Sequence, residues 1–153
     1  MYIIYGKGVC SGIAFGKLFQ IRKKEKTVKK YHVNDTEKEI KRLDDAFKKA
    51  DEQLTMLYKK ALSEVGEDNA SIFEIHRMML KDDDFLNSIY SCVKDQRLNA
   101  EAAVAIAEDN FSQIFSSMDD SYMKDRASDV HDISGRLIKI LTNGGTSANA
   151  NAL

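Results

Sequence analysis

The sequence predicts a mainly α protein: an antiparallel bundle of about four helices, the second broken in two, preceded by a short β segment. The 153-residue chain has no proline, and its glycines lie in the first sixteen residues, at Gly66 and Gly135, and in a C-terminal pair. Long uninterrupted helices are therefore allowed from about 35 to 142. Apolar side chains recur at helical spacing over that range. A chain of this length buries one ordinary core.

The first element differs from the rest of the chain. Residues 2–21, "YIIYGKGVCSGIAFGKLFQI", carry β-branched and aromatic side chains broken by four glycines, which predicts one or two strands with a turn. No other stretch resembles a strand. Because a lone strand pair is not stable in water, this segment is expected to be part of a sheet whose remainder is missing.

A long helix follows. Asn34, Asp35 and Thr36 form a plausible N-cap cluster, and the helix is expected to end near Gly66. Its apolar positions alternate spacings of three and four, which is typical of a helix packed nearly antiparallel to its neighbours. This seam consists of Ile40, Leu43, Phe47, Ala50, Leu54, Leu57 and Ala61.

Two short helices come next. Asp68 and Asn69 offer a cap for a helix over 70–80, whose apolar residues cover more than one face. A helix over 84–96 follows, and the acids at 82–84 suit its positive N-terminal end.

Two further helical patterns complete the bundle. Asn99 is expected to cap a pattern that runs to Met118, and Asp119-Asp120 opens a last pattern that runs to Leu141. The tail over 143–153 is small and polar, which predicts disorder.

Charge and cysteine content exclude several function classes. The net charge of −1 gives no overall attraction to nucleic acid or to an anionic membrane. No apolar run is long enough to span a bilayer, so no membrane association is expected. Cys10 and Cys92 show neither CxxC nor zinc-ligand spacing, which favours a reducing, cytoplasmic setting without a metal site. Locally, residues 21–32 carry about +5, and residues 63–84 about −5.

Three stretches together resemble one family. They are "GIAFGKLF" from Gly12, "IFEIHRMMLKDDDF" at 72–85, and "DDSYMKDRASDVHDISGRL" at 119–137. In order and spacing they are similar to the start of phosphoenolpyruvate-protein phosphotransferase, enzyme I of the bacterial sugar phosphotransferase system. The resemblance covers roughly residues 5–141, and its last stretch is the most specific.

The resemblance implies a helical domain, inserted in an α/β phosphohistidine domain, that docks the small phosphocarrier protein HPr during sugar uptake. Residues 1–31 would then be a strand and linker of the truncated α/β domain, 32–142 the HPr-binding bundle, and 143–153 a disordered tail. HPr in this family presents an apolar patch ringed by lysines and arginines. The implied acidic rim comprises Glu67, Asp68, Glu74, Asp83 and Asp84. The implied apolar centre comprises Ile72, His76, Met78, Met79, Phe85 and Phe115, and the floor is completed by Tyr122, Met123 and Arg126. Arg126 is the candidate to attract the phosphoryl group on the partner.

The resemblance also implies what this chain does not do alone. The family's phosphorylated histidine follows a Gly-Gly-x-x-Ser sequence, whereas Ser147 is followed by alanine and no histidine comes after His131. The region that binds phosphoenolpyruvate and magnesium in the parent transferase, and the C-terminal portion that dimerises, are also absent. We therefore expect no catalytic residue, no cofactor and no phosphoryl transfer by this chain alone.

Two other functions stay open, one that uses His76 and one that uses the seam of the long helix. A self-contained histidine phosphotransfer protein would need a free imidazole with a lysine and a small residue close behind, but Met79 and Leu80 stand there. A lone histidine beside apolar residues is also commonly structural. The other alternative is a structural bundle that self-associates through the seam over 40–61.

Overall fold

The computed structural model describes residues 11–13, 15–17 and 28–144, and the bundle predicted from the sequence is confirmed. Within those residues there are five helices. They are α1 (Thr36–Val65), α2 (Glu67–Leu80), α3 (Asp83–Lys94), α4 (Ala100–Ser117) and α5 (Ser121–Gly144). α2 and α3 are the two halves of the element that the sequence predicted to be broken.

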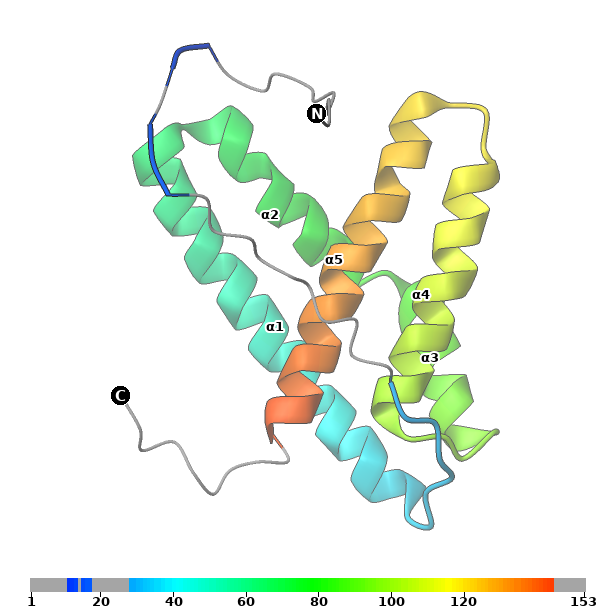
Figure 1. Cartoon of the computed structure of the whole chain (residues 1–153). Helices are drawn as coiled ribbons and strands as arrows, with labels where there is room; N and C mark the ends of the chain where they lie inside the picture. Colours follow the sequence, from blue (N-terminus) through cyan, green and yellow to red (C-terminus); the bar gives the residue numbers. More distant parts are fainter. Residues whose placement is uncertain (1–10, 14, 18–27, 145–153) are drawn as a thin grey trace.

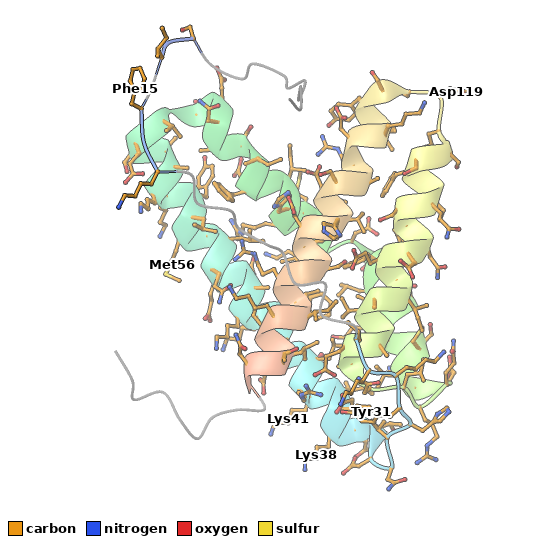
Figure 2. All side chains as sticks on the ribbon, in the orientation of Figure 1. Phe15, Tyr31, Lys38, Lys41, Met56 and Asp119 are labelled. Atoms are coloured by element: carbon orange, nitrogen blue, oxygen red, sulfur yellow. The ribbon has the colours of Figure 1, made fainter. Side chains whose placement is uncertain are left out.

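The helices form two antiparallel hairpins, α1 with α2 and α4 with α5 (Figure 1). α5 also packs on α1, and α3 packs on α4. In Figure 1 the two hairpins diverge toward the turns that join their helices. Asp119 lies at the turn between α4 and α5 (Figure 2). α2 also contacts both α3 and α5.

The core runs between the hairpins. The predicted seam of α1 is confirmed from Ile40 to Leu57, because Leu43, Ala50 and Leu54 are fully buried and Ile40, Phe47 and Leu57 pack against the core. Ala61 at its end is partly exposed. Each large aliphatic side chain buried in this way stabilises the fold by about 1.5–3 kcal/mol. The largest fully buried apolar side chains of the other elements are Ile89, Val93, Leu98, Val104, Val130, Ile133, Leu137 and Leu141.

Most helix ends follow the predicted caps. The Asp35 side chain accepts a hydrogen bond from the backbone N–H of Lys38 at 2.9 Å, and Gly66 ends α1 with φ +87°, a conformation that favours glycine. The predicted cap at Asp68-Asn69 is wrong. α2 begins at Glu67, directly after Gly66, and no side chain caps it.

Asn99 occupies the N-cap position of α4, as predicted, but its side chain serves another purpose. Its Oδ1 accepts from the backbone N–H of Tyr31 at 3.1 Å, and its Nδ2 donates to the carbonyl of Lys29 at 3.1 Å. A backbone hydrogen bond from Val33 to Arg97 continues the pairing. The segment entering the bundle is therefore tied to the α3–α4 loop.

Beside Asn99 lies a group of partly buried charges that we call the closed-end cluster, made of Glu39, Arg42 and Glu101. Arg42 donates to Glu39 at 2.7 Å, to Glu101, and to the carbonyl of Leu141 near the end of α5. Glu39 also accepts from the backbone N–H of Ala100 at 2.7 Å. The cluster joins α1, α4 and α5 through one guanidinium.

The predicted β segment falls mostly outside the described residues. Residues 11–13 and 15–17 contain no strand, and Phe15 is 98% exposed (Figure 2). Among the described residues the β-type contact is a single bridge between His32 and Leu98. At the other end, α5 includes residues 143 and 144 of the predicted tail, whose remainder lies outside the described range.

Candidate docking site

A groove of about 490 Å³ opens where the α2–α3 junction meets α4 and α5. Its aromatic floor is built from Phe85, which is 2% exposed and packs edge-to-face on Phe111 with ring centroids 5.5 Å apart. Phe115 continues this row, 6.3 Å from Phe111. The full lining comprises Met79, Asp82, Asp84, Phe85, Phe111, Ile114, Phe115 and Val130. The groove therefore combines an apolar floor with two carboxylates.

The start of α3 places these carboxylates. Asp82 is the N-cap residue, and its side chain accepts from the backbone N–H of Phe85 at 3.0 Å. Asp83 and Asp84 occupy the first turn, where the helix dipole stabilises negative charge. The cap that starts α3 thus places Asp82 and Asp84 in the lining of the groove, beside the floor residue Phe85.

The imidazole of His76, on α2, is buried. Its side chain is 9% exposed, and Nε2 lies 3.2 Å from Oδ1 of Asp129 on α5, a distance at which the ring N–H donates to the carboxylate. Phosphoryl transfer by the histidine requires an accessible ring nitrogen. The burial of this imidazole instead indicates a tie between two helices.

Asp129 connects His76 to Arg126. Nη1 of Arg126 donates to Oδ2 of Asp129 at 2.6 Å, and the guanidinium lies 4.4 Å from the centre of the Tyr122 ring. Burial alone would lower the pKa of Arg126, but the hydrogen bonds and charges of Asp129 and Tyr122 outweigh it and raise the pKa above its usual value. Arg126 therefore stays charged. We call His76, Asp129, Arg126 and Tyr122 the docking-side cluster.

The structure brings together part of the predicted site. Met79, Asp84, Phe85 and Phe115 all line the groove. Of the predicted residues on α5, Tyr122 is 61% exposed, and Met123 and Arg126 are partly exposed.

Other predicted residues lie on a different face of α2. With about 100° of rotation per residue, Asp68, Ile72 and Met79 lie on one side of His76, whereas Glu67, Glu74 and Met78 lie on the opposite face. Glu74 and Met78 line a second hollow of about 370 Å³ together with Ser71, Ile75, Arg77 and Lys81. The predicted rim is thus divided between two faces of α2.

Sequence reasoning missed several residues of the site. Asp129 was not predicted, although it stands three residues after Arg126, a spacing that brings side chains together on a helix. Phe111 and Ile114 share the helical spacing of Phe115 and could have been found the same way. Asp82 was recognised only as part of the acidic run. Among the described residues, no group of three histidine, cysteine or acidic side chains could hold a metal ion.

A family model described as "PEP-utilising enzyme, N-terminal" matches residues 5–126. The chain belongs to this family. It is 35% identical to the phosphoenolpyruvate-protein phosphotransferase of Bacillus subtilis (strain 168) over 137 residues, which are 90% of this chain and 24% of that protein. The Priestia megaterium protein of the same name is 37% identical over 88% of this chain and 24% of its own length. The chain thus spans about a quarter of these curated relatives.

Solved structures agree with this membership in the PEP-utilising N-terminal family. An NMR solution structure of Enzyme I matches with a TM-score of 0.72 and 28% identity, over 76% of this chain and 48% of that one. A structure titled "N-terminal domain of Enzyme 1 - Nitrogen" matches with a TM-score of 0.72 and 26% identity, over 82% and 51%. The predicted resemblance to the N-terminal part of enzyme I is confirmed. Within the described residues, no helix combines the length and apolar character required to cross a membrane.

Proposed function

We propose that this chain is the docking module of a phosphoenolpyruvate-protein phosphotransferase and binds the phosphocarrier protein HPr. The groove above the Phe85–Phe111 pair carries the proposal, because it places acids at the edge of an apolar floor. A carrier that must bind, react and leave needs a modest apolar contact for register and complementary charge for fast association. The apolar patch of HPr, ringed by lysines and arginines, is complementary to this groove.

In this proposal each predicted site residue has a role. Asp68, Asp83 and Asp84 attract the basic ring of HPr, while Ile72, Met79 and Phe115 contact its apolar patch. Methionine suits such a surface because its side chain adapts to the partner. His76 and Phe85 support the surface from beneath, and Tyr122, Met123 and Arg126 extend it along α5. Glu67, Glu74 and Met78, which lie on the opposite face of α2, contact HPr at the edge of the interface.

The domain boundaries and setting follow from the same proposal. In this proposal residues 32–142 are the HPr-binding bundle, which α5 extends to Gly144, and residues 1–31 belong to the α/β phosphohistidine domain. The parent enzyme transfers phosphate from phosphoenolpyruvate with magnesium, dimerises through its C-terminal portion, and works in the cytoplasm. Within that activity, residues 32–142 are proposed to supply the docking step.

Burial weighs against both alternatives. His76 contacts Asp129 rather than solvent, which does not suit a histidine that accepts phosphate. The seam over 40–61 is filled from within the chain, since Leu43, Ala50 and Leu54 are fully buried. The centre of that seam therefore offers no free surface for a second copy.

Charge reversal tests the proposal. The double variant Asp83→Lys/Asp84→Lys should slow association with HPr by about tenfold or more at low salt and much less at high salt, because salt screens electrostatic steering. Stopped-flow fluorescence measures the rate. The matched control is Asp45→Lys/Glu52→Lys, which makes the same charge change at exposed positions of α1. An unchanged rate for the first variant at low salt, with the fold intact, would contradict the proposal.

A further inference from the structure

Asp129 lies between two side chains of the proposed HPr surface. One of its oxygens is 3.2 Å from Nε2 of His76 on α2, and the other accepts from Nη1 of Arg126 at 2.6 Å. Both oxygens of this carboxylate are thus engaged by residues that the resemblance assigns to docking. No motif in the sequence assigns a role to Asp129 itself.

The contact is well shielded from water. The exposed fraction of the side chain is 9% for His76, 12% for Asp129 and 13% for Arg126. Charged groups at this depth interact more strongly than at the surface, and breaking such a contact leaves a charge without compensation. The orientation of Arg126 therefore depends strongly on Asp129. In an exposed ion pair at the same i, i+3 spacing, the dependence would be much weaker.

Asp129 and Tyr122 together define where the guanidinium lies. The ring of Tyr122 is 4.4 Å from it, and Asp129 contacts it through one nitrogen, Nη1. Recognition of a phosphoryl group by arginine uses a planar fork of N–H donors. A guanidinium already held in one plane loses less side-chain entropy when such a group arrives.

We propose that Asp129 is a positioning residue: it orients Arg126 toward the phosphoryl group carried by HPr, and His76 fixes the carboxylate of Asp129 in turn. This inference rests on the proposed docking function. It assigns His76 a role through Asp129, and it predicts that the docking-side cluster distinguishes phosphorylated from unphosphorylated HPr.

The test compares Asp129→Asn with Asp132→Asn, which removes the same charge from an exposed position of α5. Calorimetry measures the affinity of each full chain for HPr and for HPr phosphorylated on its histidine, with ³¹P NMR verifying that the phosphoryl group stays in place. Asp129→Asn should weaken binding of phosphorylated HPr by roughly tenfold, the order expected for misplacing one charge-assisted hydrogen bond, and binding of unphosphorylated HPr much less. Asp132→Asn should change neither affinity.

A spectroscopic readout separates positioning from simple destabilisation. In ¹⁵N NMR of the chain without HPr, the Nε–Hε signal of Arg126 should shift in Asp129→Asn and stay in place in Asp132→Asn. Equal weakening of both forms of HPr, with an unmoved Arg126 signal, would overturn the proposal.

Two substitutions of His76 give an independent arm, which also serves if Asp129→Asn does not fold. Gln retains an N–H donor for Asp129, so His76→Gln should preserve the preference for phosphorylated HPr, whereas His76→Leu should reduce it. If His76→Gln and His76→Leu prefer phosphorylated HPr to the same degree, the proposed role of His76 is overturned. If the unmodified chain binds neither form of HPr, the docking function itself fails. If it binds both and Asp129→Asn leaves their ratio unchanged, only the positioning role fails.

Discussion

The closed-end cluster and the docking-side cluster are each built around an arginine that pairs with carboxylates of low exposure, yet they differ in what surrounds them. Arg42 of the first lies among Glu39, Glu101 and the carbonyl of Leu141, and Asn99 beside it ties down the entering segment. Arg126 of the second lies beneath Tyr122, which is 61% exposed. The same chemistry thus joins three helices at one place and supports a surface at another. Breaking the first should mainly affect stability, and breaking the second should mainly affect binding.

Phe85 does not fit this division between stability and binding. It lines the groove, yet it is as buried as the core. Phe85→Ala should lower the free energy of unfolding by about 3–5 kcal/mol, since it removes a buried ring and its contact with Phe111. Urea unfolding followed by circular dichroism measures this loss. A loss below about 1 kcal/mol would show that Phe85 serves the partner rather than the fold.

Arg42→Met tests the closed-end cluster directly. The variant leaves Glu39 and Glu101 without their shared cation, and it should lower the free energy of unfolding by about 2 kcal/mol while the folded fraction binds HPr normally. Urea unfolding and calorimetry measure the two effects. Lys41→Met, at the exposed neighbouring position (Figure 2), is the control and should change little. A loss of HPr affinity with unchanged stability would reverse the comparison.

Acid should weaken the closed end. Burial would raise the pKa of Glu101, but hydrogen bonds from Arg42, its own backbone N–H and Asn99 lower it below the usual value. Because the folded state then binds fewer protons than the unfolded state, the contribution of Glu101 is complete above about pH 4.3 and is lost as pH falls through its lowered pKa. The slope of unfolding free energy against pH below this point should be shallower in Glu101→Gln. Identical slopes would contradict this account.

Substitution of Gly135, which belongs to neither cluster, should have the smallest effect on stability and none on binding. Gly135 lies within α5, and a Cβ added there would meet nothing within 4 Å. Gly135→Ala should therefore raise the free energy of unfolding by about 0.5–1 kcal/mol through the better helix propensity of alanine, without changing HPr affinity. A thermal melt and one calorimetric titration check both parts. A changed affinity would show that α5 couples stability to the surface.

Local patterns predicted the fold well because each helix carries its own signals. The cap at Asp35, the glycine after α1 and the three-four spacing of Leu43, Ala50 and Leu54 act within one or two turns. The start of α2 was misplaced because Gly66 both ends one helix and precedes the next directly. That geometry left Asp68 inside the first turn instead of before it.

The site was harder to predict because it depends on which helix faces which. Residues as near in sequence as Met78 and Met79 lie on different faces of α2 and line different hollows. The contact between His76 and Asp129 joins positions 53 residues apart, so no local pattern reveals it. The resemblance predicted docking residues on α2, α3, α4 and α5, and the structure added Asp129 as the residue that contacts the buried imidazole of His76.

Mapping HPr onto the chain by NMR titration tests the central claim most directly, that the groove side docks HPr while the closed end maintains the fold. Addition of HPr should shift the amide signals of Ile72, Met79, Asp84, Phe115 and Tyr122, and leave those of Tyr31, Arg42 and Glu101 in place. Shifts centred on Tyr31, Arg42 and Glu101, or no shifts at saturating HPr, would contradict the account.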